Sequence, residues 1–171
     1  MLAVNNTTKY QINLKKISGL AEKFLRAYKK TDREISLAII GDARMKRLNR
    51  EYRGINKTTD VLSFGAEKRG QEKARPAEPA RSKYLGEIII NIQEARRVAK
   101  YQGMFAELGL IDPADKINAK IKKISSIRIQ DYLFYFLLIH GLLHLIGYDD
   151  ATVQGRREML ERGQKFLSKN L

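Results

Sequence analysis

The stretch HGLLHLIGYDD, which runs from His140 to Asp150, gathers side chains that can bind a transition metal. His140 and His144 are the only histidines in the chain. On a helix, residues four apart lie on one face with Cβ atoms about 6 Å apart, so both rings can point at one position. Gly147 can end that helix and let the chain fold back, which would bring Asp149 or Asp150 to the same position. Three protein ligands and a water are typical of a catalytic zinc site.

The two histidines have a second interpretation. Within a buried helix both rings can simply satisfy hydrogen bonds, and an HxxxH pair alone does not exclude this. The clustering of both histidines with a glycine and two aspartates favours the metal. Gly141 follows His140, where an HExxH metalloprotease has its general-base glutamate, so peptide hydrolysis is disfavoured. Because the chain has no cysteine, a metal must take imidazole, carboxylate, carbonyl or water ligands.

The composition favours a polyanionic partner. The chain of 171 residues has a formal net charge of +14, from 33 Lys and Arg against 19 Asp and Glu. Such an excess indicates RNA or a ribosomal surface first, although a solvated basic surface would have the same composition. The length predicts one domain over residues 1–171, with a core that needs no disulfide or structural metal.

The sequence favours a cytoplasmic protein without a membrane partner. Its first residues, MLAVNNTTKYQINL, lack the basic region and long apolar run of a secretory signal. The longest apolar run, Tyr132 to Ile146, contains both histidines and is shorter than the roughly 20 residues that span a bilayer. The absence of cysteine fits a reducing compartment.

Hydrophobic spacing and capping residues predict strands and helices in alternation. The apolar helix that carries the histidines is expected to end at Gly147. Residues 65–83 mix charges with two prolines and predict a mobile loop, whereas residues 104–130 have no pattern that assigns their structure. We expect strands at 2–5, 34–40, 59–64 and 85–90, and helices at 13–30, 42–53, 91–103, 131–146 and 152–171.

Three blocks of the sequence, NREYRGINKTTDVLSF, LGEIII and HGLLHLIGYDD, follow one another between about Ile35 and Asp150. They resemble the N-x-x-Y-R-G and T-D-V-L-S-F segments, the L-G-D-I-x-I strand and the HGxLHLxGYDH signature of the YbeY family. These are bacterial endoribonucleases and rRNA maturation factors. The resemblance implies an α/β fold with a small mixed β-sheet flanked by helices, and a metal held by three histidines.

The resemblance assigns two of these ligands to His140 and His144, and the third falls on Asp150, where the chain departs from the family pattern. A carboxylate oxygen can replace the imidazole, as in the two-histidine, one-carboxylate sites that hold zinc or iron. Its negative charge should make a bound water less acidic. Asp149 matches the family's own aspartate and is a rival ligand, or else a proton-transfer group.

Arg53 matches the arginine that the family places at its active-site cleft. A guanidinium can grip a phosphodiester and stabilise the charge that develops on it, whereas the alternative is a solvated arginine at a helix end. The same side of the cleft would be shaped by Thr59, Asp60 and Ser63. Alternatively, these residues only begin a strand and pack in the sheet.

The resemblance therefore predicts a metal-dependent single-strand endoribonuclease that acts in rRNA maturation and ribosome biogenesis. Its cofactor would be one divalent transition metal ion, with zinc favoured. Its partners would be single-stranded RNA or rRNA and the small ribosomal subunit or its proteins, whereas the oligomeric state is left open. Because imidazole must be neutral to bind a metal, we expect metal binding and activity to fall below about pH 6.

Two other functions fit parts of the sequence. Asp150 and the basic charge would also suit a non-catalytic RNA-binding ribosome-assembly factor with a degraded or structural metal site. A metal-dependent hydrolase of a small molecule would fit the histidines but would leave the basic charge without a role.

Overall fold

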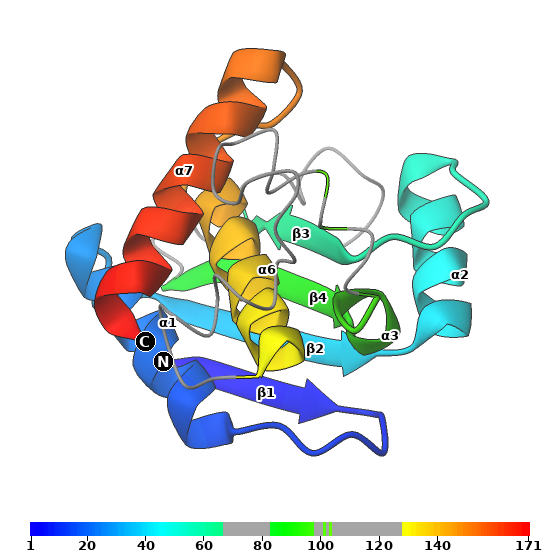
Figure 1. The fold of residues 1–171 in the computed structure, drawn as a ribbon, viewed down its shortest axis with the longest axis horizontal. Coiled ribbons are helices and arrows are strands. Elements are labelled where there is room, and N and C mark those ends of the chain that lie inside the picture. Colours follow the sequence, from blue (N-terminus) through cyan, green and yellow to red (C-terminus); the bar gives the residue numbers. More distant parts are fainter. Residues whose placement is uncertain (67–82, 98–100, 102, 104–127) are drawn as a thin grey trace.

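The computed structural model describes residues 1–66, 83–97, 101, 103 and 128–171. Its centre is a four-stranded sheet with the strand order β1-β2-β4-β3 (Figure 1). β1, β2 and β4 are parallel, and β3 pairs antiparallel to β4 at one edge. This arrangement confirms the expected α/β fold with a small mixed sheet. The strands are β1 (Leu2–Asn6), β2 (Glu34–Ile40), β3 (Val61–Gly65) and β4 (Tyr84–Asn91).

Helices cover both faces of this sheet. Successive residues of a strand point to opposite faces, and β4 divides its isoleucines accordingly. Ile88 and Ile90 belong to the larger core with α1, α6 and α7, whereas Ile89 packs with Met45 of α2. In Figure 1, α6 crosses in front of the sheet and α2 lies at its right-hand end. The helices are α1 (Leu14–Ala27), α2 (Asp42–Arg53), α3 (Ile92–Ala95), α6 (Ile129–Leu145) and α7 (Val153–Asn170).

α6 is the centre of the larger core. Eleven of its residues are buried, and they lie all around the helix, which is typical of a helix enclosed by its neighbours. The tyrosines Tyr132 and Tyr135 are among them, at 2% and 6% exposure, so both rings pack in the core. Within the described ranges, no helix is long and apolar enough to cross a membrane.

Several predicted boundaries are confirmed because they depend on local chemistry. The Asn13 side chain caps α1 by accepting a hydrogen bond from the Lys16 N–H at 2.9 Å. Gly54 ends α2 with a φ of 69°, a conformation that glycine adopts without strain. The Thr152 side chain caps α7 through the Gly155 N–H at 3.0 Å.

The helix predicted at 91–103 is interrupted, because α3 ends at Ala95 and residues 96 and 97 are not helical, whereas residues 101 and 103 are helical again. The N–H groups of Arg96 and Arg97 bond the carbonyls of Gln93 and Glu94 three residues back, and such bonds tighten the last turn. The Arg97 side chain also leaves the helix to contact Asp42 at 2.7 Å. Residues 67–82 of the expected loop, and 104–127 of the unassigned segment, lie outside the described residues.

α6 lies very close to the sheet at Gly141. A Cβ atom there would lie 2.8 Å from Cγ2 of Ile88 and 3.1 Å from Oγ of Ser63, on β4 and β3. Ile88 is fully buried, so it has little room to move. This contact sets the distance between the sheet and the helix turn that carries His140.

We expect Gly141→Ala to lower the free energy of unfolding by about 1–2 kcal/mol, because overpacking exceeds the gain in helix propensity. Gly19→Ala in α1 is the matched control, since a Cβ atom at Gly19 would meet nothing within 4 Å. It should raise the free energy of unfolding by about 0.5–1 kcal/mol. Urea unfolding of both variants measures the difference, and equal stabilisation by the two would contradict the close contact.

Candidate metal centre

His140 and His144 lie one turn apart near the C-terminal end of α6. Their ring centroids are 4.8 Å apart and the ring planes are perpendicular. The His140 ring also lies parallel to Phe136 one turn earlier, at 6.4 Å and 20°. The two side chains are 12% and 26% exposed, so both reach the rim of the core rather than its interior. The helix therefore presents two imidazoles to one partly open position.

The turn after α6 brings an aspartate back to these rings. The Tyr148 N–H bonds the Leu143 carbonyl and the Gly147 N–H bonds the His144 carbonyl, both at 3.1 Å. This pair of bonds is the Schellman motif, and Gly147 supplies the required positive φ at 102°. The Tyr148 ring then packs edge-on against Tyr28 at 6.3 Å. The reversal places Asp150 above the helix face that it has just left.

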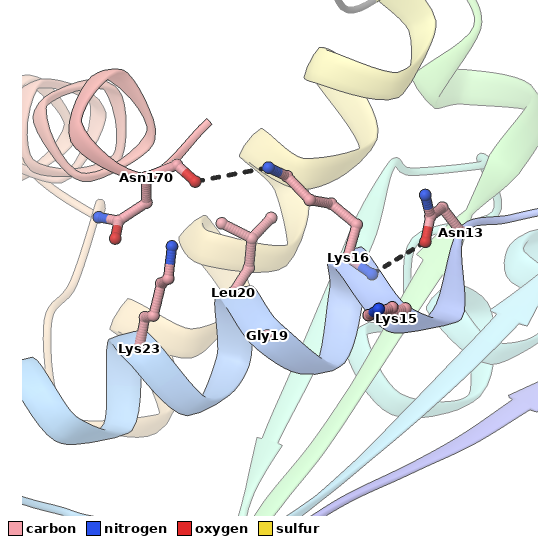
Figure 2. Close-up of a pocket in the computed structure, with 7 residues that line it drawn as sticks. All are labelled: Asn13, Lys15, Lys16, Gly19, Leu20, Lys23 and Asn170. Atoms are coloured by element: carbon pink, nitrogen blue, oxygen red, sulfur yellow. Dashed lines mark hydrogen bonds between the residues drawn. The ribbon is translucent and has the colours of Figure 1, made fainter.

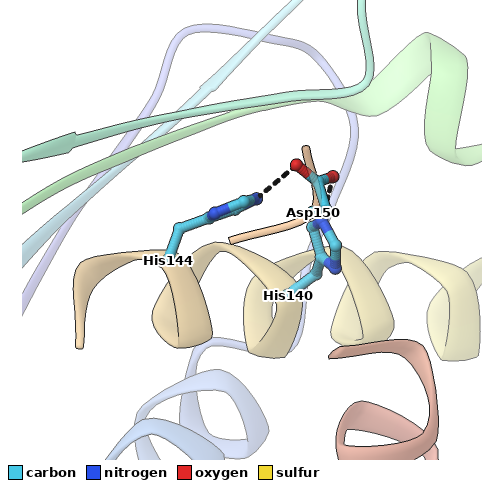
Figure 3. A group of neighbouring side chains, drawn as sticks. All are labelled: His140, His144 and Asp150. Atoms are coloured by element: carbon cyan, nitrogen blue, oxygen red, sulfur yellow. Dashed lines mark ion pairs between the residues drawn. The ribbon is translucent and has the colours of Figure 1, made fainter. Parts of the chain in front are cut away.

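Figure 3 shows the Asp150 carboxylate between the two imidazoles. Its Oδ2 lies 3.4 Å from Nε2 of His140, and its Oδ1 lies 3.8 Å from Nε2 of His144. One ligand atom from each of the three residues lies within 4.8 Å of the other two. In the described part of the chain, this is the group of histidine, aspartate or glutamate side chains that could hold a metal.

These three donors fit a zinc ion in type and spacing. Bond lengths of about 2.0–2.2 Å in a tetrahedral site separate neighbouring ligand atoms by about 3.4 Å. The 3.4 Å between Nε2 of His140 and Oδ2 of Asp150 already has this value, and Nε2 of His144 lies 3.8 Å from the other oxygen, Oδ1. Imidazole nitrogens with a carboxylate oxygen suit zinc or iron(II) better than calcium or magnesium, which prefer oxygen ligands alone.

The hydrogen bond of the second His144 nitrogen selects the tautomer that a metal requires. Nδ1 of His144 lies 3.1 Å from the Tyr148 carbonyl oxygen, which can only accept, so the ring donates from Nδ1. Nε2 then keeps its lone pair and faces Asp150. Sequence reasoning did not identify Tyr148 as a supporting residue. The glycine before it is the signal, because a Schellman turn commonly anchors its following residue by apolar contact.

Burial and neighbouring side chains shift the pKa values of His144 and Asp150. Burial, with the neighbouring His140, lowers the pKa of His144 below its ordinary value. The hydrogen bond with His140 lowers the pKa of Asp150 to about 2, so its carboxylate is charged at neutral pH. Both shifts favour the protonation states in which the two side chains can bind a metal.

Asp149 is not part of this cluster. It is exposed, and its Oδ1 accepts a hydrogen bond from the Ala151 N–H at 3.1 Å. Of the two aspartates that the sequence left open as ligands, Asp150 is therefore the one that faces the histidines. Asp149 precedes it on the exposed side of the turn.

Ser63 and Asp60, which the sequence placed together, have different surroundings. Ser63 lies on β3 against Gly141, and its Oγ has no hydrogen-bond partner among the described residues. The same is true of Nδ1 of His140. Asp60, in contrast, holds the start of β3, because Oδ1 accepts from the Val61 N–H and Oδ2 accepts from the Tyr101 hydroxyl.

Arg53 is the last residue of α2 and is exposed. It makes no hydrogen bond or ion pair with the residues that the structure describes. α2 packs on the face of the sheet opposite α6, so the sheet lies between this helix and the His140, His144 and Asp150 cluster.

A cavity of the described structure lies elsewhere. It has a volume of about 280 Å³ between the start of α1 and the end of α7, and Lys15, Lys16 and Lys23 line it (Figure 2). The Lys16 Nζ donates to the Asn170 carbonyl at 3.5 Å. None of the residues that line it belongs to the His140, His144 and Asp150 cluster.

Acidification should destabilise the metal-free protein through this cluster. The folded-state pKa of His144 lies below its ordinary value of 6.5, so the unfolded chain binds more protons below pH 6.5 and stability falls. We expect metal-free His144→Gln to lose less stability than metal-free wild type between about pH 7 and pH 5. Urea unfolding at each pH measures this, and a steeper loss in the variant would contradict the burial of the ring.

Comparison with known proteins places the chain in a family. The family model described as endoribonuclease YbeY matches residues 3–111 and 114–170. A protein named endoribonuclease YbeY from Moorella thermoacetica is 35% identical over 135 residues, which cover 79% of this chain and 71% of that protein. A protein of the same name from Nitratiruptor is 37% identical over 131 residues, covering 77% and 67% respectively.

A solution structure of a protein from Thermotoga maritima shares the fold, with a TM-score of 0.52 at 18% identity. The structural match covers 99% of this chain and 89% of the Thermotoga maritima chain. The family match extends over most of the chain and contains both histidines and Asp150. The chain therefore belongs to the endoribonuclease YbeY family.

Proposed function

We propose that the chain is a metal-dependent endoribonuclease that cleaves single-stranded RNA and acts in rRNA maturation. Membership of a family named for endoribonuclease activity supports an RNA-cleaving role. The convergence of His140, His144 and Asp150 on one partly open position is the observation that carries metal dependence. The net charge of +14 suits a polyanionic substrate.

His140 and His144 would hold a zinc ion through Nε2, with Asp150 as the third ligand. When bound, the ion would supply Lewis acidity, which activates water and offsets charge on the phosphodiester. The Tyr148 carbonyl keeps the His144 ring in the required tautomer, and packing against Phe136 orients His140. The anionic Asp150 lowers the net positive charge of this site compared with a third histidine.

Two further residues have proposed roles in the chemistry. Arg53 contacts the phosphodiester and stabilises its developing negative charge, because a guanidinium can donate two hydrogen bonds to one phosphate. Asp149, exposed beside the metal ligands, is the candidate for proton transfer. The proposed setting is the cytoplasm, with rRNA and the small ribosomal subunit or its proteins as partners.

A non-catalytic RNA-binding assembly factor is the second candidate. The observation that favours it is Asp150 itself, which stands where the family pattern has histidine. A weakened metal site could then be structural while RNA binding persists. Cleavage that depends on the metal distinguishes the two functions.

We expect the purified wild-type chain to contain about one equivalent of zinc, because three protein ligands are sufficient for a catalytic site. Asp150→Ala should lose most of this metal, whereas Asp149→Ala should retain it, since only Asp150 faces the histidines. Elemental mass spectrometry on untagged protein, prepared without chelator, measures the content. Equal zinc in both variants would show that Asp150 is not a ligand.

Cleavage of unstructured RNA by wild type should stop when EDTA removes the metal and return with zinc. The double variant His140→Ala/His144→Ala, purified in parallel, should be inactive and also reports any contaminating nuclease. Arg53→Ala should lower kcat about 100-fold with unchanged zinc, which is the usual cost of removing one donor to a developing charge. Gel analysis of labelled RNA measures these rates, and undiminished cleavage by the double variant would rule out the mechanism.

A further inference from the structure

α2 exposes a row of unpaired cations. Lys46, Arg50 and Arg53 follow one another at spacings of four and three, so they lie on one face of the helix. Arg44 and Arg47 add two further exposed cations. Within the described ranges, none of the five is paired with a carboxylate. Of the two acids of the same helix, Asp42 is paired with Arg97 at 2.7 Å, and Glu51 is exposed without an ion pair among the described residues.

α7, in contrast, carries two arginines that are paired with carboxylates of the same helix. There, Arg157 pairs with Glu161 at 2.8 Å, and Arg162 pairs with Glu158 at 2.7 Å. Both are pairs four residues apart, which neutralise charge along the helix. In the part of the chain that the structure describes, α2 has no corresponding pairs, so its positive field extends into solvent.

An exposed tyrosine lies at the same end of α2 as Arg53, about 100° around the helix from it. Tyr52 is 44% exposed and its neighbour in the following turn, Ile55, is 43% exposed. The Tyr52 ring contacts Phe64 edge-on, with centroids 5.0 Å apart and planes inclined by 62°. Its hydroxyl has no hydrogen-bond partner among the described residues. Phe64 thus contacts the ring from one side, and part of the Tyr52 surface stays open to solvent.

One strand separates this ring from the metal centre. Phe64 and Ser63 are consecutive residues of β3, and they point to opposite faces of the sheet. Phe64 contacts Tyr52, whereas Ser63 lies against Gly141, the residue after His140. β3 is also one of the two edge strands of the described sheet. A flexible strand of nucleotides that passes around this edge can therefore reach both faces.

We propose that the cationic face of α2 and the Tyr52 ring form a binding track for single-stranded RNA that leads around β3 to the metal centre. This inference rests on the proposed function and names the surface that holds the substrate. Lys46 and Arg50 contact phosphates, and Tyr52 stacks on one unpaired base. Aromatic rings between cations are a common way to bind single strands without sequence preference.

Tyr52→Trp tests the stacking directly, because the natural chain contains no tryptophan and the introduced indole is then the sole fluorophore of its kind. Titration with unlabelled oligouridylate, in EDTA to keep the RNA intact, should quench the indole emission of this variant. Tyr10→Trp is the matched control, since Arg96 already covers the Tyr10 ring at 4.9 Å from its centroid. Its emission should change little. Saturable RNA binding by the Tyr52→Trp variant with no change in its emission would overturn the proposal.

Affinity measurements by fluorescence anisotropy test the same ring without a new fluorophore. Tyr52→Leu should weaken the binding of labelled oligouridylate roughly 5- to 100-fold, which is the usual loss when one base loses its stacking partner. Tyr52→Phe should retain the affinity, because the ring remains. Both variants keep an apolar contact with Phe64, so both should fold. Equal affinity of the Leu and Phe variants would overturn the stacking.

The charge of α2 is tested by Lys46→Ala/Arg50→Ala. Loss of two phosphate contacts should reduce the slope of log affinity against log salt by about 1.4, at about 0.7 per contact for a single strand. Lys23→Ala/Arg26→Ala on α1 removes the same charge from exposed residues elsewhere, and its slope should stay unchanged. If both double variants reduce the salt slope equally, RNA binding depends on total charge and not on α2, which would overturn the proposal.

These binding assays do not depend on cleavage. If wild type binds RNA through Tyr52 and α2 but never cuts it, the proposed catalysis fails and the track stands. If RNA is cleaved in a metal-dependent way while all α2 variants bind normally, the catalysis stands and the track fails.

Discussion

The packing of α6 against the β3–β4 pair is the contact on which the metal centre depends. Gly141 lets the helix approach Ile88 and Ser63 more closely than any side chain would allow. The residues on either side of this contact are therefore held at a fixed height above the sheet. His140 precedes Gly141, and His144 lies one turn later, so the rigid core sets the position of both imidazoles before any metal binds. Such preorganisation reduces what binding must order.

The third ligand depends on a different and more local constraint. A Schellman turn at Gly147 reverses the chain within a few residues and places Asp150 between the rings. The aspartate side chain is shorter than histidine, yet its two oxygens lie within 3.4 and 3.8 Å of the two Nε2 atoms. The replacement therefore changes the charge of the site more than its reach. Its chemical consequence is a less electropositive metal position.

Much of this arrangement could be predicted from the sequence because it depends on local chemistry. The Asn13 cap, the Gly54 stop and the strand at 34–40 follow from short-range patterns, and the structure confirms them. Helical spacing alone places His140 and His144 on one face. The choice between Asp149 and Asp150 could not be made in this way, because it depends on the direction in which the turn leaves the helix.

The features that escaped prediction are long-range contacts. Just after the end of α3, Arg97 contacts Asp42, a residue far away in the sequence. Likewise, Ser63 meets Gly141 only because β3 pairs with β4 and α6 lies across both. The carbonyl of Tyr148 is invisible to any search for side-chain motifs, although it orients His144. Hydrophobic periodicity and capping residues predict each helix or strand by itself, but they do not predict which faces of these elements pack together.

The most direct test of a preformed metal centre is anomalous X-ray diffraction at the zinc edge from crystals of the zinc-loaded protein. The account predicts one strong anomalous peak about 2.0–2.2 Å from Nε2 of both histidines and from a carboxylate oxygen of Asp150. A peak bound by His140 and His144 with Asp150 turned away would contradict the two-histidine, one-aspartate site. Zinc found only at other positions would contradict the metal centre altogether.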